Sequence, residues 1–516
     1  MRPQNSQKFD FNNLFIFEMA NNHQGDLSHG KRIVREMARI AREHGIRAAV
    51  KLQFRDLDTF IHPAHRENRE HKHIGRFLST RLTEEEFAEL LNEIRSEGLI
   101  TMVTPFDELS VGLIEKLNVD VIKIGSPSAR DWPLLERVSQ SDKPIIVSTG
   151  GLALRDIDNI ASFFEHRYKH IALMHCVSIY PTPHEKLELN QIELLRHRYP
   201  GISIGFSTHE EPDNSEAIQV AFSKGARLFE RHVGIPTDTI TLNKYSSTPE
   251  QISRWIAAYK RAVAICGGMT RPDTDPKESA DLSSLFRGVY AKRDIHTGDK
   301  VNWADVFFAM PINDGQLSSG QFRDGLVADR EYKQHEGLSS SLASSKPLKK
   351  HLIYQAIHDV KGMLNEARVP IGEGGFFDVE LSHHYGLERF HEVGVVIIDC
   401  INREYGKKIL VQLAGQTHPH HYHKKKEEAF HVIYGELHVE MNGKERILHP
   451  GDVLVVERGS VHKFWTPTGT IFEEISTTSY SDDSIYLDPE IQNKKRDLRK
   501  TKLINWGRHQ FDNVDF

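Results

Sequence analysis

The chain has 516 residues and a net charge of -6, and 39% of its residues are hydrophobic, which is typical of a globular protein with more than one core. No apolar run reaches the roughly 20 residues of a membrane span, and the N-terminal stretch lacks a secretory core, so we expect a cytoplasmic protein without membrane contact. The basic clusters at 424–426 and 494–502 lack interleaved aromatic residues, which argues against nucleic acid as a partner.

From residue 15 to about residue 264, short apolar segments alternate with stretches of helical periodicity. The expected strands are 15–20, 47–54, 100–106, 121–126, 144–150, 171–176, 203–208 and 228–233. Eight βα units of this kind predict a (β/α)8 TIM barrel over residues 1–275. A doubly wound sheet is the alternative, but it rarely contains eight such regular units.

Polar residues collect at the C-terminal ends of the expected strands, where parallel α/β folds keep their chemistry. In chain order they are Glu18 with Asn22 and His23, Lys51 with Gln53, Thr104, Lys123 with Ser126, Ser148 with Thr149, His175, Ser207 with His209, and Glu230 with His232. Any one of these could be a satisfied ion pair at the barrel rim. Together they predict a pocket, because unpartnered charges beside apolar strands are costly.

Two kinds of chemistry follow from these residue types. Lys51 and Lys123 supply ammonium groups for an anion, and hydroxyl donors accompany them at Thr104, Ser126, Ser148 and Ser207. Glu18 and Glu230 are candidates for proton transfer. His209 and His232, at the ends of neighbouring strands, are candidate ligands of a divalent ion such as Mn or Mg; hydrogen bonding within the rim is the alternative.

The pattern changes after the barrel. Residues 280–340 contain β-runs and a His296-Thr297-Gly298-Asp299 turn, which predict a small β-rich domain. Residues 348–516 begin with a helical pattern and continue as short alternating strands punctuated by turns, which predicts an all-β sandwich or jelly roll. Three widely separated cysteines argue against a disulfide framework.

The barrel motifs also carry a family resemblance. FEMANNHQG, VKLQF, VTPFD, IKIGSPS, PIIVSTGG, LMHCVSIYPTP, IGFSTH and FERHV together resemble the sialic acid synthase family, whose members condense phosphoenolpyruvate with an N-acetylmannosamine-like sugar. The run SLFRGVYAKRDIHTGDKVNWADVFFAMP resembles the small antifreeze-like (SAF) domain of that family. The resemblance implies a synthase that makes a sialic-acid-like 3-deoxy-2-keto (nonulosonic) acid and releases phosphate. It also implies a domain-swapped homodimer.

Residue roles follow from the matching positions. His209 and His232 match the family's metal ligands, and Glu18 matches the glutamate near the sugar carbonyl. The positions that match phosphoenolpyruvate contacts are Lys51, Thr104, Lys123, Ser126, Ser148 and Ser207. Gln53 and Tyr180 match sugar contacts, and we place Asn22 on the same sugar side.

Three positions depart from the family pattern. The loop at 234–246 lacks the usual Arg-Pro-Gly stretch and sugar-binding aspartate, with Asp238 or Asn243 as replacements. Met310 precedes Pro311 where the family often has an arginine, and Ser178, a candidate substrate contact, stands in place of an asparagine. These changes motivate an alternative, a non-catalytic sugar-binding regulatory protein derived from such a synthase. A different aldolase-like barrel that uses no phosphoenolpyruvate is a third possibility.

The C-terminal region resembles the cupin family. Gly415, His421, His423, Glu428 and Gly435 fit G-x5-HxH-x4-E-x6-G, and Gly451, Gly459 and His462 fit most of the partner motif, although Glu457 and Thr466 depart from it. On adjacent antiparallel strands His421, His423, Glu428 and His462 are expected to converge on a divalent metal, either Zn, Mn, Fe or Ni. The domain is then either a metal-dependent sugar isomerase or epimerase, or a sugar-binding module; a metal-free sugar-binding cupin is the alternative.

Overall fold

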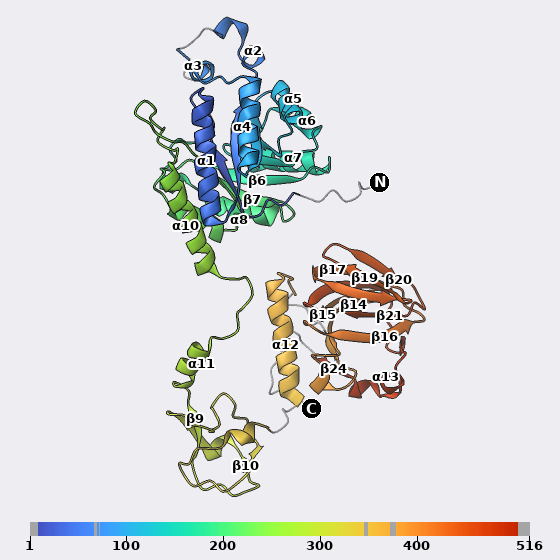
Figure 1. The fold of residues 1–516 in the computed structure, drawn as a ribbon. Helices are drawn as coiled ribbons and strands as arrows, with labels where there is room; N and C mark the ends of the chain where they lie inside the picture. The colour runs from blue at the N-terminus through green and yellow to red at the C-terminus, as the bar shows by residue number, and fades with distance from the viewer. Residues whose placement is uncertain (1–8, 67–69, 72, 345–348, 372–377, 504–516) are drawn as a thin grey trace. The chain divides into compact units, whose positions relative to one another are not determined.

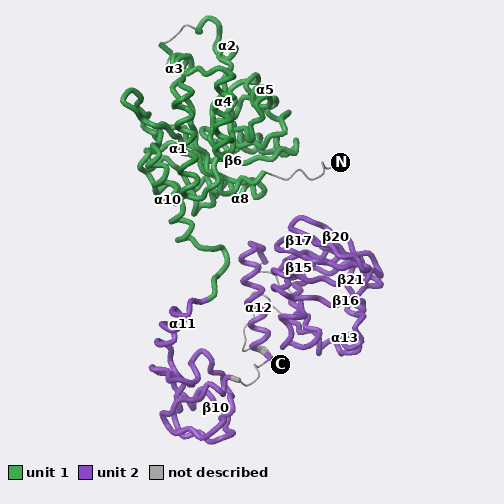
Figure 2. The backbone as a smooth tube through the Cα atoms, in the orientation of Figure 1, with its two compact units in different colours: residues 1–273 green, residues 274–516 purple. Residues whose placement is uncertain are grey.

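The chain divides into two compact units in the computed structural model, residues 1–273 and 274–516 (Figure 2). The structure describes residues 9–66, 70–71, 73–344, 349–371 and 378–503. The outer limits expected for the domains, at residues 1, 348 and 516, lie outside these ranges. None of the described helices combines the length and apolarity that a membrane span needs.

The first unit is a closed barrel of eight parallel strands, coloured blue to green in Figure 1. The strands are β1 (Leu14–Glu18), β2 (Arg47–Phe54), β3 (Ile100–Pro105), β4 (Val121–Ile124), β5 (Ile145–Ser148), β6 (Ile171–Cys176), β7 (Ser203–Thr208) and β8 (Leu228–His232). The barrel closes through parallel pairing of β1 with β8, in which Glu18 lies opposite His232. The predicted TIM barrel is confirmed, and its strands end within two residues of the expected positions.

Helices alternate with the strands around the barrel. They are α1 (Leu27–His44), α4 (Glu84–Ser96), α5 (Glu108–Lys116), α6 (Trp132–Ser139), α7 (Leu154–Glu165), α8 (Asn190–Arg198), α9 (Glu216–Ser223) and α10 (Pro249–Cys266). Capping explains several of their limits: Asp26 accepts backbone hydrogen bonds at the start of α1, and Thr83 forms a capping box with Glu86 at the start of α4. Two short helices, α2 (Leu57–Phe60) and α3 (Ile74–Ser79), lie between β2 and α4.

The period of two in the strands positions the polar residues inside the barrel. Ile16, Ala49, Val121 and Leu228 belong to an apolar cluster that fills the lower interior, and each is fully buried. Two residues further along, the side chain faces the same side of the strand. The polar residues that follow at this spacing are Glu18, Lys51, Lys123 and Glu230. The same rule places Thr104 after Met102, and Ser148 after Ile146.

The second unit begins with α11 (Pro276–Ser283) and a small β-rich region. Its strands are β9 (Gly288–Ala291), β10 (Lys300–Val301), β11 (Val306–Ala309) and β12 (Leu326–Val327), which form two antiparallel pairs. Val289, Leu317, Phe322 and Leu338 are among the residues of its own small core. The predicted β-rich character of this region is confirmed. Met310, which follows β11, is 55% exposed.

The remainder of the second unit contains two antiparallel sheets. The helices are α12 (Lys349–Glu366) and α13 (Pro489–Asn493). The larger sheet has the order β20-β17-β22-β15-β14-β13-β24, and the smaller β19-β18-β21-β16-β23. The strands are β13 (Asp378–Ser382), β14 (Val395–Asn402), β15 (Tyr405–Gln412), β16 (Thr417–His423), β17 (Glu428–Gly435), β18 (Leu437–Met441), β19 (Lys444–Leu448), β20 (Val453–Val456), β21 (His462–Trp465), β22 (Thr470–Thr477), β23 (Ser484–Tyr486) and β24 (Lys500–Leu503). The predicted all-β jelly-roll class is confirmed.

Two apolar layers hold this region together. Ile353, Ile357 and Val360 of α12 pack with Val379 and Ile398 of the larger sheet. A second cluster is formed by strands of both sheets, including Leu410, Val439, Phe430, Phe464 and Phe472. Aromatic contacts reinforce it: the rings of Phe430 and Phe472 lie 5.1 Å apart, edge to face.

Candidate functional site

A cavity of about 1190 Å³ opens at the C-terminal ends of the barrel strands. The expected site residues that line it are Glu18, Lys51, Gln53, Thr104, Lys123, Ser126, Ser148, Ser178, Tyr180, Ser207, His209, Glu230 and His232. They come from strands or loops around the whole barrel. The residues that the sequence pattern singled out therefore line one shared cavity and do not form separate contacts around the rim.

Four buried charged groups form the floor of this cavity. Lys51 Nζ contacts a carboxylate oxygen of Glu18 and lies 2.9 Å from Glu230 Oε1. Lys123 Nζ lies 3.4 Å from Glu230 Oε2 and donates to Ser148 Oγ at 2.6 Å. Ser207 Oγ donates to Glu230 Oε1 at 3.0 Å. Two cations and two anions thus neutralise each other, and a ligand that enters must exchange partners with them.

The environment gives the two carboxylates different proton affinities. Burial and the charge of Glu230 raise the pKa of Glu18, against the opposing pull of Lys51. Burial also acts on Glu230, but Lys123 and Lys51 outweigh it and hold its pKa below the ordinary value. Burial lowers the pKa of Lys123, with only partial compensation by Glu230. Glu18 is therefore the carboxylate that takes up a proton more readily.

A second side of the cavity is built from hydroxyl groups around Gly150. The Gly150 N–H donates to Ser126 Oγ at 3.1 Å. A Cβ at Gly150 would lie 2.4 Å from Ser178 Oγ and 2.7 Å from Ser126 Oγ, so only glycine allows these hydroxyls to approach. Thr104 Oγ1 is buried and has no hydrogen-bond partner among the described residues. These hydroxyls are available to an anionic ligand.

His209 and His232 lie side by side, with ring centroids 5.3 Å apart. His209 Nδ1 lies 3.1 Å from Val177 O and donates to it, which leaves Nε2 with its lone pair. Burial lowers the pKa of His209 to about 4 and that of His232 well below its usual value, so both rings are neutral. Two neutral imidazoles fit a divalent ion. No third protein ligand joins them among the described residues, so water or substrate oxygens would complete its shell.

Asn22 differs from its expected place. It does not line the cavity; its Nδ2 donates to Val233 O at 2.7 Å and to Ser246 Oγ at 3.0 Å. These bonds tie the loop after β1 to the loop after β8. The neighbouring Asn21 lines the cavity instead. The NH2 group of Asn22 holds the two loops together, because both of its hydrogens have buried acceptors.

Sequence reasoning also missed residues that come from the connection between β2 and α4. Arg55 lines the cavity, donates to Gln53 Oε1 at 2.9 Å and lies over the Phe106 ring at 3.6 Å. Burial lowers its pKa to about 10. Arg76 and Phe77 lie in the same lining. A signal was present, since Arg55 directly follows β2, which carries Lys51 and Gln53 near its end. The neighbours of Arg55 in the cavity wall became apparent only in three dimensions.

The expected replacements in the loop after β8 fall in different places. Asn243 and Tyr245 line the cavity, whereas Asp238 does not. The Tyr245 ring lies 5.0 Å from that of His232 and 5.2 Å from that of Tyr180. This loop therefore contributes an amide and an aromatic ring to the side of the cavity that holds the two histidines.

A second cluster lies between the sheets of the C-terminal region. His421, His423, Glu428 and His462 are all buried, and one ligand atom from each lies within 4.8 Å of the others. His421 and His423 lie in the last three residues of β16. Glu428 is the first residue of β17, and His462 is the first residue of β21. Cross-strand pairing places His421 opposite His462. The convergence expected for these four residues is present.

Hydrogen bonds fix which ring nitrogen faces the centre of this cluster. The Nδ1 atoms of His421, His423 and His462 each lie 3.0 Å from a backbone carbonyl, those of Pro419, Asp483 and Ser460. Each Nδ1 therefore carries the proton, and each Nε2 presents a lone pair. Burial keeps the pKa of His421 well below its usual value. This set fits a divalent metal ion, because three neutral imidazoles and one carboxylate are common metal ligands.

The contact between Glu428 and His462 also supports a metal site. Glu428 Oε1 lies 3.0 Å from His462 Nε2, and both atoms are buried without a hydrogen-bond donor among the described residues. Two acceptors at this distance repel each other unless a cation lies between them. The other oxygen of Glu428 lies 2.5 Å from Lys426 Nζ. Burial opposes the charge of Glu428, but Lys426 outweighs it and lowers the pKa of the carboxyl group.

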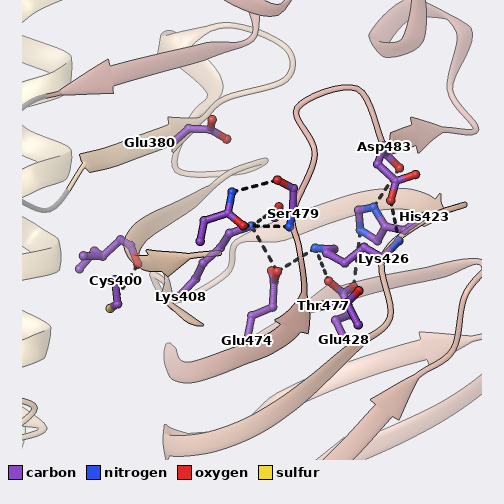
Figure 3. A network of polar contacts seen from close by, with 12 residues as sticks. Glu380, Cys400, Lys408, His423, Lys426, Glu428, Glu474, Thr477, Ser479 and Asp483 are labelled. Atoms are coloured by element: carbon purple, nitrogen blue, oxygen red, sulfur yellow. Dashed lines mark hydrogen bonds and ion pairs between the residues drawn. The ribbon is translucent and has the colours of Figure 1, made fainter. Parts of the chain in front are cut away.

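Lys426 connects the cluster to a wider polar network (Figure 3). Its Nζ also lies 2.7 Å from Glu474 Oε1, which in turn lies 3.2 Å from Lys408 Nζ. Lys408 donates to Ser479 Oγ at 3.0 Å. The carboxylate of Asp483 accepts from the N–H groups of Lys424, Lys425 and Lys426, so the loop that carries Lys426 is held in place. The metal-ligand cluster is thus supported by a buried shell of ion pairs.

Two family models match the chain. One, described as the NeuB family, matches residues 37–271, and the other, described as a cupin domain, matches residues 409–475. The first match covers most of the barrel. The second runs from β15 into β22 and contains all four members of the His421 cluster.

Individual proteins also resemble this chain. A solved structure described as a putative spore coat polysaccharide biosynthesis protein E from Chromobacterium violaceum ATCC 12472 is 42% identical, with a TM-score of 0.62, over 64% of this chain and 98% of that chain. N-acetylneuraminate-9-phosphate synthase of Drosophila melanogaster is 27% identical over 60% of this chain and 89% of its own. N,N'-diacetyllegionaminic acid synthase of Campylobacter jejuni is 24% identical over 48% and 74%.

Proposed function

Because the chain belongs to the NeuB family and carries a cupin domain at its C-terminal end, we propose that it is a synthase that condenses phosphoenolpyruvate with an aldose. The proposed sugar is N-acetylmannosamine-like or another modified hexose. The product is a 3-deoxy-2-keto (nonulosonic) acid, and inorganic phosphate is released. The names of the relatives, which are sugar acid and sugar acid phosphate synthases, support this class of reaction.

One observation carries the proposal: a single cavity contains Lys51, Lys123, Glu18, Glu230 and a wall of hydroxyl groups at the C-terminal mouth of the barrel. Phosphoenolpyruvate has a phosphate and a carboxylate, which suit ammonium groups and hydroxyl donors. When the anion binds, it competes with Glu18 and Glu230 for the two lysines. The electrostatic attraction of Lys51 for both carboxylates is then weaker. Gln53 and Tyr180 then face the sugar.

The proposed reaction balances as phosphoenolpyruvate plus aldose plus water giving keto acid plus phosphate. The methylene carbon of phosphoenolpyruvate attacks the aldehyde carbon and forms the new carbon–carbon bond. Glu18, whose pKa burial raises, donates a proton to the aldehyde oxygen. The attack leaves an oxocarbenium-like centre at the carbon that bears the phosphate. Water adds to this carbon and supplies the keto oxygen; one of its protons returns to Glu18, and the other leaves with phosphate, which departs with the bridging oxygen. Lys123 and Ser148 hold the leaving phosphate.

The histidines of the barrel mouth complete the site. A divalent ion, Mn or Mg, on His209 and His232 would act as a Lewis acid on the sugar aldehyde. The protein favours metal binding because both rings are neutral and Val177 fixes the orientation of His209.

The domain limits that we propose are 1–275 for the synthase, 280–340 for a SAF-like domain and 348–516 for the cupin domain. A domain-swapped homodimer is proposed with them, and light scattering on the full chain tests it.

The test uses the full-length protein with phosphoenolpyruvate, a panel of aldoses and Mn or Mg. We expect phosphate release that requires both the sugar and the metal, with the new acid identified by its mass. Glu18→Gln should lower turnover by at least about 100-fold while phosphoenolpyruvate still binds, because a proton-transfer group typically contributes that much. The matched control is Glu36→Gln on the surface of α1.

A negative result would favour a different class. If no aldose gives phosphate although metal and phosphoenolpyruvate bind, the barrel is a non-catalytic sugar-binding regulatory protein derived from a synthase. The same conclusion holds if the wild-type protein shows no turnover and Glu18→Gln only weakens sugar binding. Absence of phosphoenolpyruvate binding, with Lys51 and Lys123 unprotected by that ligand, would favour an aldolase-like barrel instead.

A second function is proposed for the cupin domain, on the strength of the His421 cluster. We propose that it holds Zn, Mn, Fe or Ni and acts on a sugar as an isomerase or epimerase, or binds it without chemistry. The test uses full-length Glu18→Gln protein, in which the barrel reaction is suppressed. Conversion of an aldose to a ketose or epimer, followed by NMR, supports the isomerase; sugar binding without conversion supports the binding module.

A further inference from the structure

A cavity of about 180 Å³ lies beside the His421 cluster. This is roughly the liquid volume of six water molecules, which suits one monosaccharide and not an oligosaccharide. Its charged lining is uneven. The cationic residues are Lys408, Lys426, Arg496, Arg499, Lys500 and Lys502, and the carboxylates are Glu380, Asp399, Glu428 and Glu474. The cations therefore outnumber the carboxylates before any metal is bound.

The ion pairs inside the cavity leave two cations over among the described residues, Arg499 and the exposed Lys502. Glu474 is shared by Lys426 and Lys408. Glu380 is shared by Arg496, at 3.1 Å, and by Lys500. Arg499 has no carboxylate within ion-pair distance among the described residues, and its Nε and Nη1 atoms are buried without a hydrogen-bond acceptor there. Buried guanidinium N–H groups without acceptors are costly, so they indicate a missing partner.

Tyr486 connects Arg499 to the metal-ligand cluster. The guanidinium carbon lies 4.9 Å from the centre of the Tyr486 ring. The same ring stacks on His421, with centroids 5.5 Å apart and planes inclined by 24°. A guanidinium that stacks through its face keeps its N–H groups in its own plane, where they can donate. One small ligand can therefore reach both Arg499 and the open side of the cluster.

We propose that this cavity binds a monosaccharide that carries a carboxylate or a phosphate, with the anionic group on Arg499 and the hydroxyl groups towards His421, His423 and His462. A guanidinium binds either anion through two parallel hydrogen bonds, and the anion supplies the acceptors that the buried N–H groups of Arg499 lack. A neutral sugar offers Arg499 only hydroxyl acceptors, which neither match the guanidinium with two parallel bonds nor compensate its charge. The anionic contact is independent of the synthase reaction, whereas the hydroxyl contact rests on the divalent ion proposed for the cupin domain.

The experiment compares matched sugars on the full-length protein loaded with Mn. Titration calorimetry is carried out with glucuronate, galacturonate and mannuronate, with the phosphates of the same hexoses, and with glucose, galactose and mannose. All proteins carry Glu18→Gln to suppress the barrel reaction, and phosphoenolpyruvate is left out because its carboxylate and phosphate would compete for Arg499. The variants are Arg499→Gln, Arg499→Lys and the control Arg458→Gln, which makes the same change on the exposed surface of the cupin domain. Thermal unfolding checks that each variant is folded.

We expect at least one charged sugar to bind about tenfold or more tightly than its neutral counterpart. Arg499→Gln should weaken that sugar by roughly 10- to 100-fold, the range of a hydrogen bond to a charged group, and leave neutral sugars unchanged. Arg499→Lys should retain part of the affinity, and Arg458→Gln all of it. A uronate preference identifies a carboxylate ligand, and a hexose phosphate preference identifies a phosphate ligand.

Three results would overturn the proposal. They are equal affinity for charged and neutral sugars, unchanged affinity in folded Arg499→Gln protein, and no binding of any charged sugar at millimolar concentration. Removal of the metal separates the two contacts, because chelation should weaken charged and neutral sugars alike while Arg499→Gln affects only charged ones. Loss of the synthase reaction would appear as absent phosphate release and would leave these titrations unchanged.

Discussion

His421 and His462 face each other across the β16–β21 ladder, and each donates its Nδ1 hydrogen to the carbonyl two residues before it, Pro419 O and Ser460 O. Their rings lie 4.2 Å apart. The same local hydrogen bond thus orients both rings and leaves both Nε2 atoms with lone pairs. Because each bond runs to a carbonyl of the same strand or of the turn just before it, the local backbone itself orients both rings for a metal ion.

The first prediction concerns this metal site. His421→Ala should lower the metal content of dialysed protein by about one divalent ion per chain, because one of four ligands is lost. His420→Ala is the control: its ring points to the opposite side of β16 and lies 3.3 Å from Glu440. Mass spectrometric metal analysis measures the difference. Equal metal content in the two variants would show that the cluster does not bind the ion.

The second prediction concerns Lys426. Lys426→Met leaves Glu428 and Glu474 buried without their shared cation, so we expect the cupin domain to lose about 3–5 kcal/mol of stability. Lys425→Met is the control, because Lys425 pairs with Asp482 at the exposed surface, where a pair contributes about 0–1 kcal/mol. Hydrogen exchange of peptides from β17 and β22 in urea reports on this domain alone. Similar losses in both variants would contradict the assigned role.

Much of the barrel site was predictable because strand geometry has a simple period. Once the strands are located, Ile16 inside the barrel places Glu18 inside it too, and Ala49 does the same for Lys51. Parallel strands then bring these positions to one mouth. The apolar pattern alone does not mark β16, because its sequence THPHHYH has no apolar alternation. Its inward positions hold histidines, and only the resemblance to the cupin motif placed these on a strand.

Loop residues were harder to predict for a physical reason. The position of Asn22 after β1 suggested a ligand contact, yet its side chain bonds to Val233 and Ser246, more than 200 residues away. Nothing local in the sequence encodes that contact. Arg55 and Phe77 likewise meet in the cavity wall only because the connection between β2 and α4 folds over the mouth. Period-based reasoning applies to strands and helices and does not extend to such segments.

The third prediction separates the two adjacent asparagines. Asn22→Ala should destabilise the barrel by about 1–3 kcal/mol, because Val233 O and Ser246 Oγ lose their buried donor. Asn21→Ala should change stability by less than about 0.5 kcal/mol and instead raise the KM for the sugar, since Asn21 lines the cavity. Urea unfolding and steady-state kinetics measure the two effects. If Asn22→Ala instead raised the KM and Asn21→Ala lowered stability, Asn22 would be the residue that contacts the sugar.

The fourth prediction concerns the pH dependence of barrel stability through His23, which follows β1. Its Nδ1 accepts the Gly25 N–H at 3.1 Å, so a proton on Nδ1 would break this bond. Burial, with smaller contributions from His29 and Arg76 against Glu86, lowers its pKa from 6.5 to about 4. Between these two pH values the unfolded chain therefore binds more protons at this site than the folded chain, and stability rises with pH.

The contribution of His23 is thus complete above pH 6.5 and is lost as the pH falls from 6.5 towards 4, by at most about 3 kcal/mol. His23→Asn keeps an acceptor for Gly25 but does not titrate, so its unfolding free energy should depend less steeply on pH in this window. His197→Asn, at an exposed position of α8, should keep the wild-type slope. Pulse proteolysis in urea, followed on peptides from residues 9–266, measures the three slopes. If His23→Asn and wild type have the same slope, the folded barrel binds the His23 proton as readily as the unfolded chain does, and the bond to Gly25 does not control its charge.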